Sequence, residues 1–293
     1  MTAFSSFHPF VNFIYFVCAI GFSCFFMHPI SLFLSLAAGI TEFLIIRGRK
    51  GWKLLLCMCS AVPLTALINA AFNHRGVTVL FYFWNGNPMT AESVLYGIAA
   101  GTMLLCVILH FHFWNAIMTS DKIICLFGNI LPTLSLVFSM TLRFIPRFSK
   151  YFSEAAEMER CMGGKREKKF FHRVRQGLRL VSMVTTRAIE NAVETADSMR
   201  ARGYGLPKRT AFSVFRFRKK DAKLAVFLLC TAAAVLGGKL FGGAEFMYFP
   251  VVSWGGSPIW TYIFFTAYGM LLACPLFLEM QEVRKWKALR SGM

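Results

Sequence analysis

Long apolar runs alternate with short polar segments along most of this chain. Six of the runs have about the 20 residues that an α-helix needs to cross the roughly 30 Å hydrocarbon core of a bilayer. They cover residues 10–27, 30–46, 54–72, 93–117, 222–241 and 259–279. The pattern predicts an all-α polytopic membrane protein with about six membrane-crossing helices.

Charge is concentrated in one part of the chain. The whole chain is 56% apolar and 16% charged, with a net charge of +18. Residues 143–223 alone hold 21 Lys and Arg against 8 Asp and Glu, a net charge of +13. Basic loops of membrane proteins stay in the cytoplasm, so this stretch is predicted to be cytoplasmic. We expect N-terminal membrane helices (1–142), a cytoplasmic insert (143–221) and C-terminal membrane helices with a basic tail (222–293).

The orientation rule also bears on a seventh apolar run, residues 123–142. The basic loop 47–53 should be cytoplasmic, and three full crossings after it would put the insert outside. The seventh run contains Pro132 and ends in a proline- and arginine-rich segment. We therefore expect it to lie on, or re-enter from, the cytoplasmic side. The six remaining crossings leave both termini in the cytoplasm of a multi-pass cell-membrane protein.

Composition excludes some functions. A mean hydropathy of +0.55 and 32 Phe exclude a disordered chain. Runs of bilayer length argue against a nucleic-acid-binding protein, whose basic patches lie on soluble folds. No cofactor or metal site is predicted. The pairs Cys57/Cys59 and His110/His112 are two residues apart, which separates their side chains by about 200° around a helix.

Polar residues are sparse in the predicted spans. Glu42, Asn69 and Glu92 lie near span ends, and we expect no chain of ionisable groups of the kind that a proton relay needs. We therefore interpret them as groups that anchor the spans at the interface. Gly97 and Gly101 form a G-x-x-x-G spacing, which permits a neighbouring helix to approach closely. That spacing does not identify the neighbour.

The insert contains a strongly amphipathic helix, predicted between Val181 and Tyr204. Its apolar positions recur every three or four residues, and its acids cluster on the opposite side. The apolar positions are Val181, Val184, Ala188, Ala192, Ala196 and Met199, and the acids are Glu190, Glu194 and Asp197.

The end of this helix carries two arginines in different situations. Arg200 lies three residues after Asp197 and can pair with it, whereas Arg202 has no acid three or four residues before it. Gly203 then gives a natural helix stop. Arg202 is either an arginine that inserts into a partner's groove or an ordinary solvated arginine.

The chain shows no catalytic pattern. Gly163-Gly164-Lys165 is followed by Arg166 and lacks the first glycine and the hydroxyl of a phosphate-binding loop. No nucleophile, base and orienting acid can be assembled. We expect a non-enzymatic chain, with any ATP hydrolysis carried out by partner chains.

The sequence resembles the transmembrane (T) component of energy-coupling factor importers, the ABC-type uptake systems for vitamins and trace metals (the EcfT/CbiQ-like family). The resemblance covers nearly the whole chain and is carried by residues 73–78, 85–88, 139–148 and 196–204. The last of these contains Ala201-Arg202-Gly203, which looks like the second of the family's two coupling motifs; Met199 and Arg200 precede it.

The resemblance implies a scaffold that couples other proteins. In the family, each coupling motif ends a cytoplasmic coupling helix whose arginine docks into a groove on one of two ATP-binding cassette ATPase subunits. The membrane helices offer an apolar face to a small substrate-binding membrane protein, the S component. ATP binding and hydrolysis move the coupling helices and so reorient or release that component.

The first coupling motif departs from the family pattern. By its position after Phe144-Ile145-Pro146 it falls at Cys161-Met162-Gly163, where the glycine is kept and methionine replaces the usual arginine. Either Arg160 substitutes for that arginine, or this site binds its ATPase through apolar contact.

A rival interpretation needs no ATPase. The chain would be a stand-alone secondary transporter or a polytopic membrane enzyme, and its basic insert would bind anionic lipid headgroups of the bilayer, as juxtamembrane Lys/Arg clusters do.

Overall fold

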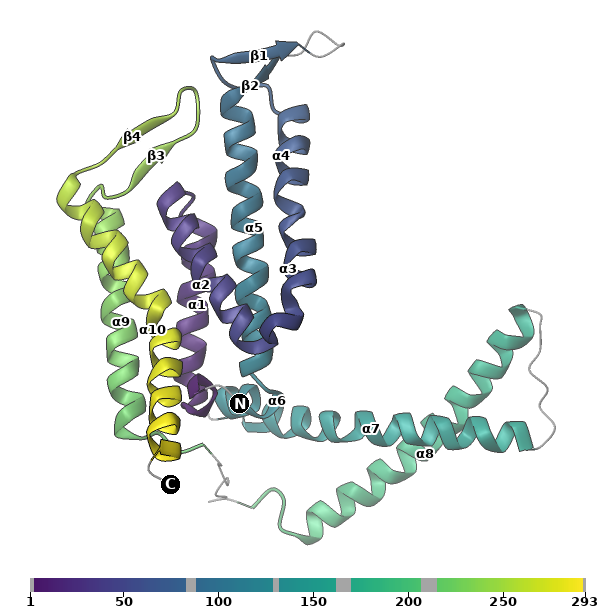
Figure 1. Cartoon of the computed structure of the whole chain (residues 1–293). Coiled ribbons are helices and arrows are strands. Elements are labelled where there is room, and N and C mark those ends of the chain that lie inside the picture. Colours follow the sequence, from purple (N-terminus) through teal and green to yellow (C-terminus); the bar gives the residue numbers. More distant parts are fainter. Residues whose placement is uncertain (1–2, 83–87, 129–131, 162–169, 207–214, 292–293) are drawn as a thin grey trace. The chain divides into compact units, whose positions relative to one another are not determined.

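The computed structural model describes residues 3–82, 88–128, 132–161, 170–206 and 215–291. The chain forms two compact units, which we describe separately (Figure 1). Unit 1 comprises residues 1–123 and 215–293, and unit 2 comprises residues 124–214. The charge pattern predicts an insert that begins at residue 143 and ends at residue 221. Unit 2 begins 19 residues before that start and ends 7 residues before that end.

Unit 1 is a bundle of apolar helices with two short hairpins. Its elements are η1 (Ala3–Ser6), α1 (Pro9–Phe25), α2 (Pro29–Arg47), η2 (Gly48–Gly51), α3 (Trp52–Cys59), α4 (Ala61–Phe72), β1 (Val79–Tyr82), β2 (Pro88–Thr90), α5 (Ala91–Ile117), the start of α6 (Ser120–Gly128), α9 (Lys219–Leu240), β3 (Glu245–Met247), β4 (Ser253–Gly255) and α10 (Pro258–Ser291). The strands pair antiparallel as β1–β2 and β3–β4. Both hairpins lie at the end of unit 1 away from the two chain termini (Figure 1).

Five helical stretches in the described residues are long and apolar enough to cross a membrane: Pro29–Arg47, Trp52–Phe72, Ala91–Ile117, Lys219–Leu240 and Pro258–Arg290. The expectation of a helical membrane protein is confirmed by this set. The first predicted span is realised as α1, a shorter apolar helix of 17 residues. The predicted run 54–72 is divided at Ser60 into α3 and α4.

Local chemistry sets where these helices begin. Pro9, Pro29 and Pro258 stand at the start of α1, α2 and α10, where a missing N–H costs nothing. The Nδ1 atoms of His8 and His28 accept hydrogen bonds from the backbone N–H of Phe10 (3.3 Å) and Ile30 (3.1 Å) and so cap α1 and α2. These histidines therefore act as the N-cap residues, a role that Ser, Thr, Asp or Asn usually fills.

The G-x-x-x-G spacing is a helix-packing site, and its neighbour is α4. A side chain added at Gly97 would meet the backbone of Ala66, and one added at Gly101 would meet Thr65 and the backbone of Val62. Only glycine lets α5 approach α4 this closely.

The resemblance segment 73–78 closes over the start of α5. The backbone N–H of Thr78 donates to Glu92 Oε1 (3.2 Å), and the Ser93 hydroxyl donates to the carbonyl of Asn73 (2.6 Å). Gly76 has φ +139°, and any side chain there would collide with Glu92. Residues 73–78 therefore help to hold the hairpin end of unit 1 together.

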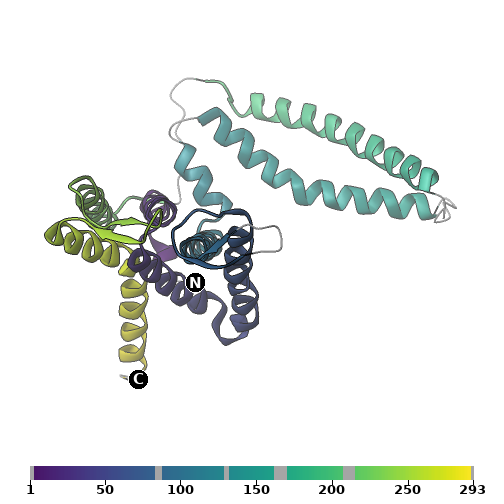
Figure 2. The same cartoon turned by 90° about the horizontal axis from the view of Figure 1, so that it is seen from above.

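Unit 2 consists of the rest of α6 and two long helices, α7 (Pro132–Cys161) and α8 (Phe170–Ala201). The seventh apolar run is divided between α6 and α7, and neither is among the helices apolar enough to span a membrane in the described residues. Arg187 of α8 joins the two long helices: its guanidinium lies 4.4 Å from the ring centre of Tyr151 and 3.7 Å from Glu154 of α7. Figure 2 shows α7 and α8 as a long helical pair.

Candidate functional site

The end of α8 is closed by a glycine turn. Gly203 adopts φ +82°, in the left-handed region that glycine tolerates. Its N–H donates to the carbonyl of Arg200, and the N–H of Tyr204 donates to the carbonyl of Met199, both at 3.0 Å. This is the Schellman arrangement, and it makes Arg202 the C-cap residue. A cation at that place complements the negative end of the helix dipole.

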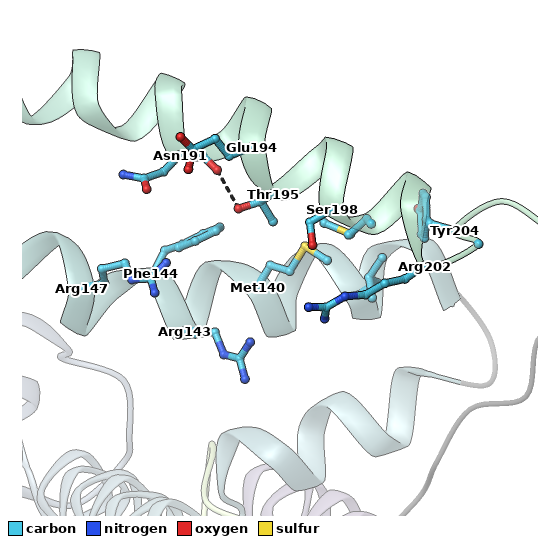
Figure 3. A pocket seen from close by; sticks show the side chains of 13 residues that line it. Met140, Arg143, Phe144, Arg147, Asn191, Glu194, Thr195, Ser198, Arg202 and Tyr204 are labelled. Atoms are coloured by element: carbon cyan, nitrogen blue, oxygen red, sulfur yellow. Dashed lines mark hydrogen bonds between the residues drawn. The ribbon is translucent and has the colours of Figure 1, made fainter.

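A groove of about 820 Å³ lies between α7 and α8 (Figure 3). Its α7 wall is Leu136, Met140, Arg143, Phe144 and Arg147, and its α8 wall is Asn191, Glu194, Thr195, Ser198, Met199, Arg202, Gly203 and Tyr204. The apolar side chains of Met140, Phe144 and Met199 are half-buried. The lining contains three arginines and one glutamate, so its charge favours an acidic partner surface.

Two segments that carry the family resemblance form this groove. Residues 139–148 supply most of the α7 wall, and residues 196–204 supply the end of the α8 wall. They are about 50 residues apart in the chain. The periodicity of the sequence gave no reason to expect them to be neighbours.

The two arginines at the end of α8 differ as the sequence predicts. Arg200 lies 3.9 Å from Asp197, and both side chains are largely exposed, so the pair contributes little stability. Arg202 is exposed and lines the groove. It enters no ion pair with any residue that the structure describes.

The structure describes only some of the other predicted site residues. Met199 lines the groove, and Ala201 is exposed at the last turn of α8. Arg160 lies in the last turn of α7, but its side chain is outside the described part of the chain. Met162 and Gly163 are also outside the described residues.

The predicted apolar stripe of α8 is divided between two faces. Val184, Ala188 and Met199 are half-buried, whereas Val181, Ala192 and Ala196 are exposed. At 100° per residue the exposed three share an arc of about 80° with other exposed apolar side chains. We call this set the open stripe: Val174, Leu178, Val181, Ile189, Ala192 and Ala196.

One expectation is wrong: unit 1 does contain a chain of buried polar and ionisable groups. Glu42 is fully buried rather than placed at the interface. It accepts a hydrogen bond from the Tyr15 hydroxyl (2.6 Å) and lies 3.1 Å from Nδ1 of His110. The prediction relied on the place of Glu42 near the end of its apolar run. However, α2 continues five residues beyond Glu42, and its side chain points into the bundle. A carboxylate within a span was itself the signal.

In the described residues, no three His, Cys, Asp or Glu side chains gather closely enough to hold a metal ion. The candidate site in unit 2 is a groove and an arginine, which suit protein contact. Unit 1 holds a separate buried polar chain.

No protein-family model matches the chain, and no curated protein matches it.

Proposed function

We propose that this chain is the transmembrane coupling subunit of an energy-coupling factor importer for a vitamin or trace metal. It carries no catalytic site of its own. Two separate ATP-binding cassette ATPases bind the coupling helices of its cytoplasmic insert, residues 143–221, and a small S component binds the substrate. The chain transmits the ATP-driven motion of the ATPases to the S component.

The observation that carries the proposal is the end of α8. Arg202 is fixed at a closed C-cap, beside a groove, without an ion-pair partner among the described residues. An arginine held in this way has five donors available for the carboxylates or carbonyls of another protein. The closed turn also fixes the backbone from which the side chain projects, so less entropy is lost when it docks.

The open stripe of α8 supports a second contact of the same helix. Leu178 and Ile189 are 64% and 61% exposed, and apolar rows at helical spacing are typical of helices that bind another helix. We assign this face to the S component, since that partner is an apolar membrane protein. One helix would then contact an ATPase at its end and the S component along its side.

The arrangement of unit 1 supports the topology that this function needs. Helices α1, α2, α3–α4, α5, α9 and α10 traverse the unit, and both chain termini lie at the end opposite the hairpins (Figure 1). We propose six crossings of the cell membrane, with the termini and the basic insert in the cytoplasm.

The buried polar chain of unit 1 is the one observation that favours the rival function, a stand-alone secondary transporter, since ionisable groups inside spans often mark ion pathways. Its members, however, are at most 1% exposed. A transport pathway needs contact with water on both sides, so we retain the coupling function.

The test is purification of the full chain in mild detergent from its native membranes, followed by mass spectrometry and an ATPase assay. We expect two ATPase chains and one small membrane protein to co-purify with the wild type. Arg202→Glu should lower ATPase recovery at least about tenfold, because losing a desolvated charge contact costs 2–5 kcal/mol. The variant should still reach the membrane, and ATP-dependent uptake should be lost.

Arg200→Glu is the matched control, since Arg200 lies on the same helix end but pairs with Asp197 outside the groove. It should retain the ATPases. A wild-type chain that purifies without ATPase activity would eliminate the coupling function, and equal losses in both variants would eliminate the specific role of Arg202.

A further inference from the structure

Six side chains from four helices of unit 1 form one continuous polar chain. From α1 come Tyr15 and Ser23, from α2 Ser35 and Glu42, from α5 His110, and from α10 Tyr268. Five of the six are fully buried, and Ser23 is 1% exposed. A polar group buried in this way must be hydrogen-bonded, or it costs several kcal/mol.

The hydrogens of the two serines can be assigned from their partners. The Ser23 hydroxyl donates to the carbonyl oxygen of Ala19 (2.7 Å), which can only accept. The Ser23 oxygen must then accept at its short contact with Ser35 Oγ (2.7 Å), so the hydrogen between them belongs to Ser35. Tyr268 donates to the same Ser23 oxygen at 3.2 Å. Both serine hydrogens are thereby committed.

This assignment fixes the hydrogens on His110. Nε2 lies 3.1 Å from Ser35 Oγ, whose hydrogen already points to Ser23, so Nε2 must carry a hydrogen and donate it. Nδ1 lies 3.1 Å from Glu42 Oε2. A neutral imidazole with its hydrogen on Nε2 has a lone pair at Nδ1, which would face the lone pairs of an ionised carboxylate. One more proton is needed between Nδ1 and Oε2.

The charge balance leads to the same result. With that proton, Glu42 and His110 carry no net charge together, whether it resides on oxygen or on nitrogen; without it they carry a negative charge inside an apolar bundle. The other titratable groups around the chain are Tyr15, Tyr268, Cys24, Cys106 and Cys274, and none is a cation. The neighbouring part of α9 contributes apolar side chains such as Leu228 and Ala232.

We propose that Glu42 and His110 form a proton-binding site that holds one proton between Nδ1 and Oε2. The bound proton makes the chain of six side chains electrically neutral and lets it join α1, α2, α5 and α10 inside the membrane unit. Since all six side chains are closed from solvent, the proton is a structural part of the bundle. The site is independent of the coupling function.

The test compares thermal unfolding of the purified full chain in lipid nanodiscs between pH 5 and pH 8. We use Glu42→Gln, His110→Asn and the double variant, each measured against the wild type at the same pH. The isolated chain is sufficient, so the result does not depend on any ATPase.

The two single variants should respond to pH in opposite directions. In Glu42→Gln a lone buried histidine must stay neutral, while the unfolded chain takes up a proton below about pH 6.5, so stability relative to the wild type should fall as pH falls. In His110→Asn a lone buried carboxyl must keep its proton, while the unfolded chain loses it above about pH 4.3. Stability relative to the wild type should therefore fall as pH rises from 5 to about 6.5, and the difference should stay constant above that, where the unfolded wild type also loses a proton.

The double variant has no titrating group at the site. It should therefore be more stable than His110→Asn at pH 8, and its stability relative to the wild type should rise above about pH 6.5, where the unfolded wild type gives up the proton that the folded wild type keeps. Single variants that follow the wild type at every pH, or that shift in the same direction, would overturn the shared proton. A double variant less stable than both single variants would also overturn it, because the damage would then come from lost packing alone.

Discussion

Unit 1 and unit 2 handle apolar surface in opposite ways. Unit 1 has a continuous core in which large side chains such as Tyr15, Phe16, Phe264 and Tyr268 are fully buried. Among the unit 2 side chains whose burial the structure describes, Leu180 alone is buried. A helix pair with so little core cannot be stabilised by its own packing. Unit 1 therefore has a core of its own, whereas unit 2 leaves most of its apolar side chains exposed.

Substitution of one glycine in each unit should reveal the difference in packing most strongly. At Gly101 a new Cβ would meet the backbone of α4, whereas at Gly177 in α8 it would meet nothing within 4 Å. We expect Gly101→Ala to destabilise the protein by about 2 kcal/mol through overpacking. Gly177→Ala should be neutral or add up to about 1 kcal/mol of helix stability.

Thermal unfolding of both variants, purified in the same detergent, measures the difference. Equal losses of stability in the two variants would mean that unit 2 is as closely packed as unit 1, contrary to the burial of its side chains.

A polar substitution on the open stripe tests whether the exposed apolar surface of unit 2 is a contact surface. Ile189→Asp places a charge on an exposed position of α8, so the free energy of unfolding of the isolated chain should stay within about 0.5 kcal/mol of the wild-type value. Recovery of the S component in the purified complex should fall about tenfold, because a charge would be buried in an apolar contact.

The control is Glu190→Asp, which lies on the same turn of α8 and keeps the charge of its position. Undiminished S-component recovery with Ile189→Asp would remove the open stripe from the proposed contact surface.

A further prediction concerns pH and the loop between α1 and α2. His28 is 3% exposed, among the rings of Phe246, Trp254 and Phe265. Burial, aided by the charge of Lys239, lowers the pKa of His28 from its usual 6.5 to about 4. The folded protein keeps His28 neutral while the unfolded chain takes up a proton, so this contribution to stability is complete above about pH 6.5 and is lost as pH falls toward 4.

The midpoint of thermal unfolding, followed from pH 7.5 to pH 4.5, should therefore fall more in the wild type than in His28→Asn, which keeps a capping side chain for α2. Identical pH profiles for the two proteins would show that His28 is not held neutral by its surroundings.

The sequence predicts the features of this protein that depend on local rules. Runs of apolar residues locate the membrane helices, and Gly203 ends α8 because a left-handed residue there closes the last turn. The Arg200–Asp197 pair follows from helical spacing alone.

What the sequence does not predict depends on contacts between distant segments. Hydrogen-bonded members of the buried polar chain lie up to 245 residues apart, and apart from Glu42 none of them is unusual in its own helix. The division of the α8 stripe into a groove face and an open face requires knowing where α7 packs. The two hairpins are too short for an alternating pattern to be recognised.

The length of α8 has a mechanical consequence. It has 32 residues and no internal proline, so it is about 48 Å long at 1.5 Å per residue. A tilt of about 10° around one end would move the other end by about 8 Å, more than the length of a helical turn. Under the proposed function, an ATPase that tilts α8 at its Arg202 end moves the far end of the helix by several ångströms.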